Sequence, residues 1–400
     1  MVCSDPTIDT PLASTVVGSV AVSPIVADPR LDQAYAVSGN TLNILDRGTL
    51  GFLTSVTLPG SVHNFPNPVR LDTGLDAVFV GDTSGGVHCI GSRTGGIVWS
   101  VSLATAGCRR VSVTATPAVH LLRYASDSFK AKYTTDVVYA STRQDETTCG
   151  RVSNQTFALR ATNGLILWVF NENGEYLMAP TLQGGWLDTA NDTLYVTADT
   201  IETDTLWAIN TLEGSLHWSR NLGKTWTTPL LRGEHLFVGT VPGDIIKVDR
   251  VDGNTVWSFR TGSLILPNIW HEFRRSYAGL ITAVGYDGLV RTIRDEGASA
   301  SLVWETQLPG IGTEETKATG GMNVDPSTGK LYVGANDGRL YQLDLFTGQV
   351  ETFRTVDPTG GTVGQGHLFI ENGDLHLLVG SSNGVIAKFC TPWSAVEPTA

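Results

Sequence analysis

The cysteines and histidines of this chain are the residues best suited to nucleophilic or metal chemistry. The sequence has 5 cysteines and 8 histidines. No two cysteines form a CxxC pair, so neither a zinc site nor a thiol redox motif is predicted. His63, His271 and His367 lie close to the starts of expected strands, where they could act as metal ligands or bases. We favour the simpler interpretation that these three are polar side chains facing water.

Longer signatures of catalysis are also missing from the sequence. It contains no GxSxG nucleophile elbow, no HExxH motif, no glycine-rich phosphate loop opening a helix and no EF-hand loop. The sequence therefore predicts no catalytic residue, no metal site and no bound cofactor.

A repeated hairpin that ends on a tryptophan organises the chain. In four copies a glycine stands four residues before the tryptophan, and a looser fifth copy ends at Trp304. The four pairs are Gly95 and Trp99, Gly164 and Trp168, Gly214 and Trp218, and Gly253 and Trp257. A strand-rich repeat of this kind is typical of a propeller or a solenoid, so the fold must consist of copies of one unit.

The clearest copy of the unit runs over residues 330–353. It contains an apolar run, a tight turn at Asn336-Asp337-Gly338, a second strand and a further turn at Thr347-Gly348. Asn, Asp and Gly suit such turns because they tolerate a positive φ. Eight copies of this order occur, and their spacing of roughly 40 to 60 residues is the length of a four-stranded propeller blade. The apolar runs do not alternate cleanly with polar residues, which indicates sheets covered on both faces.

These copies resemble the pyrroloquinoline-quinone (PQQ) type of propeller repeat, whose pattern is roughly A-x-D-x-x-T-G-x-x-x-W. The aspartate stands at Asp249 and Asp344, Asn210 replaces it in one copy, and Phe353 stands near the expected tryptophan of the seventh copy. The resemblance covers nearly the whole chain. It implies that the motif's tryptophans and glycines dock adjacent blades on one another. These blade-docking residues are Trp99, Trp168, Trp218, Trp257, Trp304, Gly95, Gly164, Gly214, Gly253 and Gly348.

We therefore predict an all-β fold, an eight-bladed β-propeller of four-stranded blades. The eighth copy ends after its third strand, and an N-terminal strand within residues 14–20 has no blade of its own. This strand should complete the last blade and close the propeller, because closure removes an open sheet edge. The predicted domain spans 14–390, after an N-terminal extension over 1–13 and before a tail or linker over 391–400. In size and blade number it resembles the propeller lipoproteins of the bacterial outer-membrane β-barrel assembly machinery.

Propeller geometry allows two disulfides. Cys108 and Cys149 fall in two loops of the third blade that emerge on one face, and Cys3 and Cys390 flank the predicted closure on the other. Cys89 lies within a strand and should be a small buried hydrophobe. Two disulfides imply an oxidising compartment, whereas the alternative is five reduced thiols. A lipid anchor at Cys3 is a further alternative, although nothing upstream resembles a signal.

Composition and loops narrow the choice of partner. The formal net charge of −12 argues against nucleic acid, and no apolar stretch has the length of a membrane helix. A protein partner is expected on the face formed by the loops before each first strand and the loops between the second and third strands, because aromatic and arginine residues are enriched in interaction hot spots. The longest loops, 125–135 and 143–155, both belong to the third blade. The residues expected on this surface are His63, Arg109, Arg110, Trp226, Trp270 and His271. Sequons at Asn154 and Asn191 are candidate glycosylation sites.

The leading hypothesis is a non-catalytic, extracytoplasmic scaffold or binding module, whether periplasmic, cell-surface or secreted. The resemblance raises a quinoprotein-like or sugar-active enzyme as an alternative, with PQQ and calcium over the propeller axis. Such dehydrogenases commonly carry a disulfide between adjacent cysteines, and this sequence has no adjacent pair, so neither PQQ nor calcium is expected. A second alternative is a recognition domain of a larger cell-surface protein, which the linker-like tail suggests.

Overall fold

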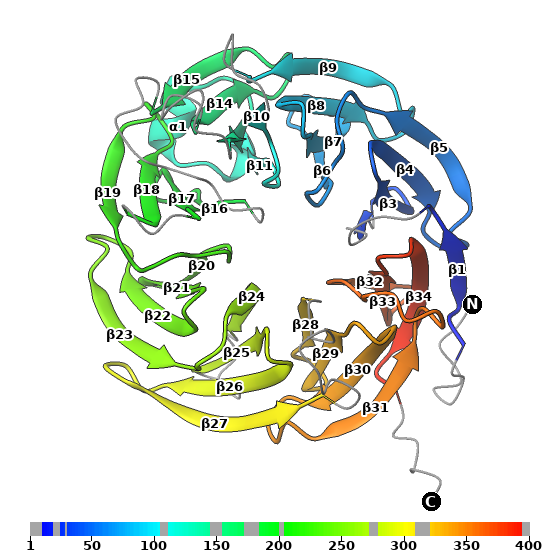
Figure 1. Ribbon diagram of the computed structural model, residues 1–400. Helices are drawn as coiled ribbons and strands as arrows, with labels where there is room; N and C mark the ends of the chain where they lie inside the picture. Colours follow the sequence, from blue (N-terminus) through cyan, green and yellow to red (C-terminus); the bar gives the residue numbers. More distant parts are fainter. Residues whose placement is uncertain are drawn as a thin grey trace, which may run out of the picture. The chain divides into compact units, whose positions relative to one another are not determined.

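Strands make up almost all of the regular structure of this protein. The computed structural model describes residues 10–18, 25–28, 30–104, 111–144, 154–171, 184–199, 204–271, 279–308 and 321–393. They form eight four-stranded antiparallel sheets and one two-stranded sheet (Figure 1). The helical segments are the 3-10 turn η1 (Leu122–Tyr124) and the helix α1 (Asp127–Lys132). The repeat pattern is thus confirmed as that of an eight-bladed β-propeller.

The chain divides into two compact units, which are described separately. Gly39–Leu42 and Thr54–Val256 form one unit, and most of its residues belong to blades 2 to 5. The strands of blades 2 and 3 are β6 (Asn67–Arg70), β7 (Asp76–Gly81), β8 (Gly86–Gly91) and β9 (Ile97–Ser102), then β11 (Ala118–His120), β12 (Val137–Ser141), β14 (Thr156–Arg160) and β15 (Ile166–Phe170). The strands of blades 4 and 5 are β16 (Trp186–Asp188), β17 (Thr193–Thr197), β18 (Leu206–Asn210) and β19 (Leu216–Arg220), then β20 (Leu230–Arg232), β21 (His235–Gly239), β22 (Asp244–Asp249) and β23 (Thr255–Arg260). The two-stranded sheet pairs β10 (Val111–Ser112) with β13 (Arg143–Gln144).

The other unit comprises Met1–Ser38, Asn43–Leu53 and Trp257–Ala400. It holds most of blade 1 and blades 6 to 8. The strands of blades 1 and 6 are β2 (Ile25–Asp28), β3 (Gln33–Ser38), β4 (Thr41–Asp46) and β5 (Phe52–Thr57), then β24 (Ile265–His271), β25 (Leu280–Gly285), β26 (Leu289–Asp295) and β27 (Ala300–Gln307). The strands of blades 7 and 8 are β28 (Met322–Asp325), β29 (Lys330–Gly334), β30 (Arg339–Asp344) and β31 (Val350–Thr355), then β32 (His367–Glu371), β33 (Asp374–Gly380), β34 (Val385–Thr391) and β1 (Ala13–Val16).

The last blade joins the two ends of the chain. Strand β1 pairs antiparallel with β34, with Ala13 opposite Lys388 and Val16 opposite Val385. The N-terminal strand therefore completes the eighth blade, as the sequence predicted.

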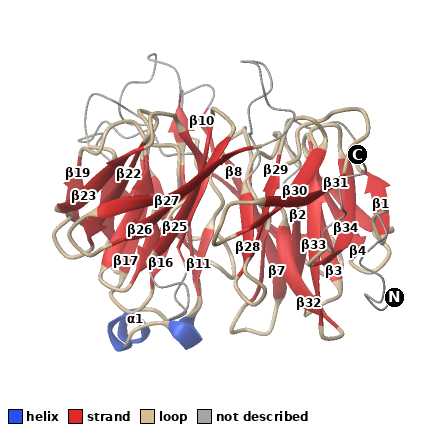
Figure 2. Ribbon diagram, turned by 90° about the horizontal axis from the view of Figure 1, so that it is seen from below, coloured by secondary structure: helices blue, strands red, loops and turns tan. Residues whose placement is uncertain are grey.

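How deeply a strand is buried depends on its position within the blade. All six residues of β7 and all six of β8 are buried, whereas the outermost strand β9 leaves Ile97 and Val98 exposed. Continuous burial of the middle strands explains why their sequences are apolar without alternation. Figure 2 shows the strands of the blades edge-on, with α1 projecting at one end.

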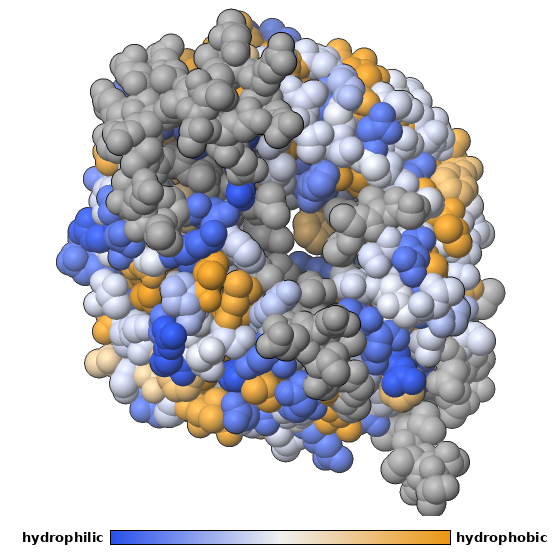
Figure 3. All heavy atoms as spheres, in the orientation of Figure 1, coloured by the Kyte–Doolittle hydropathy of each residue, from blue (hydrophilic) through white to orange (hydrophobic). Residues whose placement is uncertain are grey.

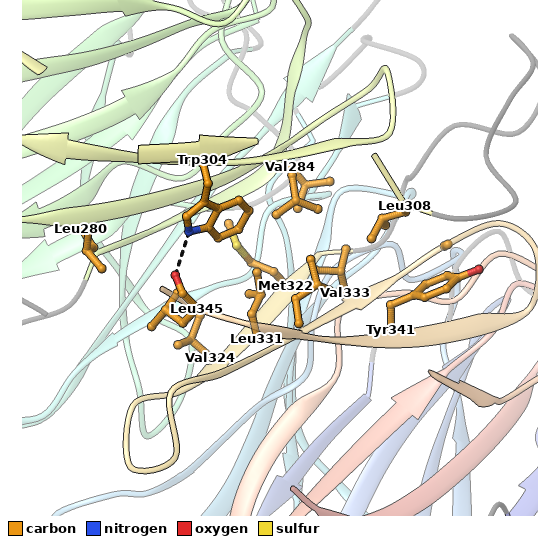
Figure 4. Close-up of a cluster of buried hydrophobic side chains, with 13 residues drawn as sticks. Leu280, Val284, Trp304, Leu308, Met322, Val324, Leu331, Val333, Tyr341 and Leu345 are labelled. Atoms are coloured by element: carbon orange, nitrogen blue, oxygen red, sulfur yellow. Dashed lines mark hydrogen bonds between the residues drawn. The ribbon is translucent and has the colours of Figure 1, made fainter. Parts of the chain in front are cut away.

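The motif tryptophans sit on the outermost strands and reach the following blade. In four of them the indole N–H donates to a backbone carbonyl of the next blade, in the turn between that blade's third and fourth strands. In the fifth the acceptor is a side-chain carboxylate of the next blade. The donor–acceptor pairs are Trp99 to Ala161 at 2.8 Å, Trp168 to Thr211 at 3.1 Å, Trp218 to Arg250 at 3.1 Å, Trp304 to Leu345 at 2.9 Å, and Trp257 to Oδ1 of Asp295 at 3.0 Å. Figure 4 shows the Trp304 ring among Val284 of β25 and Met322 and Leu331 of blade 7. Burial of the ring together with a satisfied N–H stabilises the packing of one blade on the next.

The end of the described chain is also packed into a blade. Thr391 belongs to β34, and Trp393 is 6% exposed, although the sequence placed both in a tail. The backbone N–H of Trp393 donates to Oε1 of Gln342 at 2.8 Å, and Nε2 of Gln342 donates to the carbonyl of Trp393 at 2.9 Å. Its indole packs edge-on against Tyr332 of blade 7, with the ring centroids 5.3 Å apart.

Two cysteines lie in the described part of the chain. Cys89 is fully buried as a free thiol, as expected, and burial raises its pKa to about 12. Cys390 is disulfide-bonded. Cys3, Cys108 and Cys149 lie outside the described residues, so the two proposed pairings stay predictions.

Candidate functional site: a cation and tryptophan cluster on blades 3 to 5

Loops of three successive blades bring four side chains together, which we call the cation cluster: Arg143, Asp199, Lys224 and Trp226. Arg143 lies on β13 after blade 3's second strand, Asp199 follows the second strand of blade 4, and the other two precede blade 5. Nη2 of Arg143 lies 3.0 Å from Oδ2 of Asp199, and Nζ of Lys224 lies 2.9 Å from Oδ1. The same ammonium lies 5.2 Å from the centroid of the Trp226 ring.

The electrostatics of the cluster come from one buried carboxylate held by two cations. The Asp199 side chain is 6% exposed, whereas that of Lys224 is 34% exposed. A buried carboxylate is tolerable only when paired, so Asp199 fixes the positions of both cationic groups. The ammonium over the indole contributes a further ~0.5–1 kcal/mol at an exposed site.

The backbone beneath the cluster is pinned by hydrogen bonds. Thr225 pairs with Thr240, and its hydroxyl donates to the carbonyl of Ala198 at 3.0 Å. The N–H of Val241 donates to the carbonyl of Lys224 at 2.7 Å. Lys224 and Trp226 therefore project from a loop whose backbone is held by both blade 4 and blade 5.

The structure places the sequence-predicted surface residues in different situations. Trp226 is half-buried in the cluster, and His63 is exposed between β5 and β6. Trp270 and His271 lie at the end of β24, but their side chains, like Arg109 and Arg110 altogether, fall outside what the structure describes.

The two sequons differ in accessibility. Asn154 is half-buried, whereas Asn191 is exposed and its Nδ2 donates to Oδ2 of Asp188 at 2.9 Å. Neither observation tests glycosylation, which stays a prediction for both.

Sequence reasoning missed Arg143 and Asp199 as members of a site. The long loop beginning at Arg143 was a signal, but nothing in the sequence pairs it with a carboxylate 56 residues away. Such pairing depends on how loops of separate blades meet.

A groove of about 320 Å³ lies at the junction of blades 4 and 5. This volume is at the small end of the ~300–1,000 Å³ typical of ligand pockets. Arg250 contributes the guanidinium that lines this groove, and Asp188 at 3.3 Å and Glu234 at 2.6 Å neutralise its charge. The lining residues are Asn191, Thr193, Tyr195, His217, Trp218, Arg250 and Val251.

Among the residues that the structure describes, no group of three or more His, Cys, Asp or Glu side chains could hold a metal ion. The sequence has no adjacent cysteine pair. Within the same residues, no helix is long and apolar enough to cross a membrane. On the face seen in Figure 3, apolar residues are spread in small groups with polar residues between them.

Four-stranded blades docked through repeated tryptophans define the PQQ-like class of β-propellers. Within this class the chain belongs to the family described as outer membrane protein assembly factor BamB, which matches residues 153–387, more than half of the chain. A search of curated protein sequences found no match.

Solved structures share the fold at low sequence identity. BamB from Moraxella catarrhalis is 18% identical, with a TM-score of 0.65 over 96% of this chain and 99% of that one. Sqt1 from Saccharomyces cerevisiae is 12% identical, with a TM-score of 0.71 over 96% of this chain and 99% of that one. The quinohemoprotein alcohol dehydrogenase from Comamonas testosteroni is 12% identical, with a TM-score of 0.68 over 97% of this chain and 77% of that one. At such identities the likeness concerns the fold alone, and it spans both a BamB protein and an enzyme.

Proposed function

We propose that this protein is a non-catalytic scaffold outside the cytosol and that it binds a protein partner through the cation cluster. The observation that carries the proposal is the pairing of the partly exposed Lys224 with both Trp226 and a buried carboxylate. Tryptophan and arginine are the residues most enriched in binding hot spots, and both are present here. The family's name makes the assembly of outer membrane proteins the first process in which to seek the partner.

Preorganisation supports the same proposal. Binding costs ~0.5–1.5 kcal/mol for each long side chain that must be immobilised. Asp199 already holds Arg143 and Lys224 in place, so a partner meets a surface whose long side chains lose little further freedom.

Photo-crosslinking in the source cells tests this function. A photoreactive residue is placed at Trp226, and as a matched control at Tyr124, which is 69% exposed in the connection between β11 and β12 at the other end of blade 3. A discrete protein adduct at position 226, absent at 124 and lost in a Lys224→Glu background, is expected. Equal adducts at both positions, or adducts that survive the charge reversal, would contradict a partner site at the cluster.

A native mass measurement addresses the enzyme alternative. The protein purified from its source should have the mass of the chain and its covalent modifications. Additional mass equal to a quinone or a metal ion would overturn the non-catalytic assignment. A surface-recognition role within a larger protein would use the same cluster, and the crosslinked partner would identify it.

A further inference from the structure

Three polar side chains of blade 2 form a hydrogen-bonded chain from the interior to the surface. Asp82 and His88 are 0% and 2% exposed, whereas Ser100 on the outermost strand is exposed. Oγ of Ser100 lies 2.7 Å from Nδ1 of His88, and Nε2 of His88 lies 3.0 Å from Oδ2 of Asp82. This is the connectivity by which an acid–imidazole pair activates a serine hydroxyl.

The surroundings of Asp82 favour its ionised form. Burial alone would raise the pKa of Asp82, but hydrogen bonds from His88, Ser84 and the N–H groups of Gly86 and Gly60 outweigh it and hold the pKa well below its usual range. An ionised carboxylate accepts the Nε2 proton of His88, and in a neutral imidazole this leaves Nδ1 as an acceptor. The hydroxyl of Ser100 must then donate to Nδ1, as in the resting state of a base-activated nucleophile.

The open edge of the blade supplies a donor beside the hydroxyl. In the β8–β9 register Ser100 faces His88, and the N–H of Leu103 donates to the carbonyl of Gly85. Hydrogen-bonded pairs alternate along an antiparallel ladder, so the Leu103–Gly85 bond makes Ser100 and His88 a non-bonded pair. The N–H of Ser100 therefore points away from β8, toward the edge where the blade has no further strand. Outward N–H groups next to a nucleophile can stabilise an oxyanion.

Other blades show what is particular to blade 2. His88 is the third residue of the third strand of its blade, and Arg291 holds the same position in blade 6. Arg291 also links the preceding turn to the fourth strand, through Asp287 at 2.7 Å and Glu305 at 3.3 Å. That link is a structural fastening. Serines follow the docking tryptophan at Ser219 and Ser258 as well, yet Ser219 bonds directly to Asp204 with no imidazole between them. Among the described residues, Ser100 is thus the one of these three serines whose hydroxyl lies within hydrogen-bond distance of an imidazole.

We infer that Ser100 is a base-activated nucleophile that accepts an acyl group from small carboxylic esters, a property separate from the proposed partner binding. Oγ attacks the carbonyl carbon while its proton passes to Nδ1 of His88, and the carbonyl electron pair moves to the oxygen. The tetrahedral adduct then expels the alcohol, which takes the proton from Nδ1 and leaves an ester on Ser100. The reaction ends at this ester, a stoichiometric modification that is compatible with the non-catalytic scaffold proposed above.

Labelling of the folded, full chain with an alkyl phosphonofluoridate tests this inference. The Ser100 oxygen displaces fluoride, so one phosphonyl group is added and hydrogen fluoride is lost. Peptide mapping should find the adduct at Ser100 and none at Ser219 or Ser258. His88→Asn should slow labelling by at least ~10²-fold, the usual contribution of a general base. Asparagine is a suitable replacement because Asn43 occupies the third position of the equivalent strand β4.

Two outcomes would overturn the inference. One is labelling of Ser100 at the same rate as Ser219 and Ser258, and the other is an unlabelled Ser100 in protein that is folded by circular dichroism. Should His88→Asn fail to fold, wild-type protein in urea serves instead: its Ser100 must then label no faster than Ser219. Persistence of the rate difference in urea would show that local sequence, and not the His88 contact, causes it.

Discussion

Gly164 covers the indole of Trp99, so the glycine of one repeat serves the tryptophan of the repeat before it. A Cβ at Gly164 would lie 2.8 Å from Cε3 of Trp99, and the residue has a φ of +70°. Gly348 stands in the same relation to Trp304, where a Cβ would lie 2.4 Å from Cε3. The glycine and tryptophan that lie four residues apart in the sequence thus act at two different blade junctions.

Gly164→Ala should therefore destabilise the protein for two reasons. A left-handed φ costs an alanine ~1–2 kcal/mol, and displacing a packed indole adds ~1–3 kcal/mol of overpacking. Gly297→Ala is the matched control, since its φ is +92° but nothing lies within 4 Å of the added Cβ. Denaturant unfolding should show the larger loss for Gly164→Ala. Equal losses of stability would mean that the indole moves aside at no cost and that backbone strain accounts for the whole effect.

The repeat pattern predicted the fold because every blade carries the same local signals, and blade 7 shows how one copy departs from the pattern. In its sequence Phe353 stands near the position of the docking tryptophan. Trp304 lies opposite Thr292, the fourth residue of its neighbouring strand, whereas the fourth residue of β30, Gln342, lies opposite Thr352. Phe353 is one residue further on, and a shift of one residue moves a side chain to the other face of a sheet. It is 40% exposed.

Trp393 packs where blade 7 has no docking tryptophan, and no sequence signal predicts this packing. It lies beyond the last repeat, in a stretch whose composition is that of a linker. The cation cluster could be predicted only in part for a similar reason. The order of the strands predicts the face of the propeller on which the loop of Lys224 and Trp226 lies. The ion pairs with Asp199, in contrast, depend on contacts between blades.

Trp393→Ala should cost ~3–5 kcal/mol of stability, the usual effect of truncating a buried tryptophan. The cost should be high because Arg354, which is 1% exposed, packs over the same ring with its Cζ 4.9 Å from the centroid. Phe353→Ala is the control and should cost less than half as much. Thermal unfolding of the two variants measures both. A greater loss for Phe353→Ala would show that Phe353 contributes more to the packing of blade 7 than Trp393 does.

Acid should weaken blade 3 through His120. This histidine is 0% exposed, its ring centroid lies 3.8 Å from that of Phe129, and burial lowers its pKa to about 4. An unfolded histidine has a pKa of about 6.5, so below that pH the unfolded state binds the proton more tightly. Stability is then complete above pH 6.5 and falls as the pH drops toward 4. The loss from pH 7 to pH 5 should be about 2 kcal/mol for this group.

The measurement is the denaturant midpoint at pH 7 and pH 5. His120→Gln should flatten the difference only in part, because burial also lowers the pKa values of His367 and His376. His217→Gln, at an exposed position, should leave the wild-type difference unchanged. An undiminished difference in His120→Gln would exclude this histidine as a source of the acid sensitivity.

The cysteines should separate into one inert thiol and four bonded sulfurs. Iodoacetamide reacts with thiolates, and a thiol with a pKa raised to about 12 in a fully buried position forms almost none at neutral pH. The native, unreduced protein should therefore take up no carbamidomethyl group, and denatured unreduced protein should take up one, at Cys89. Reduction before denaturing alkylation should expose the rest, and peptide mapping without reduction should recover Cys3 with Cys390 and Cys108 with Cys149. Uptake of more than one group before reduction would contradict the two-disulfide assignment and weaken the argument for an oxidising compartment.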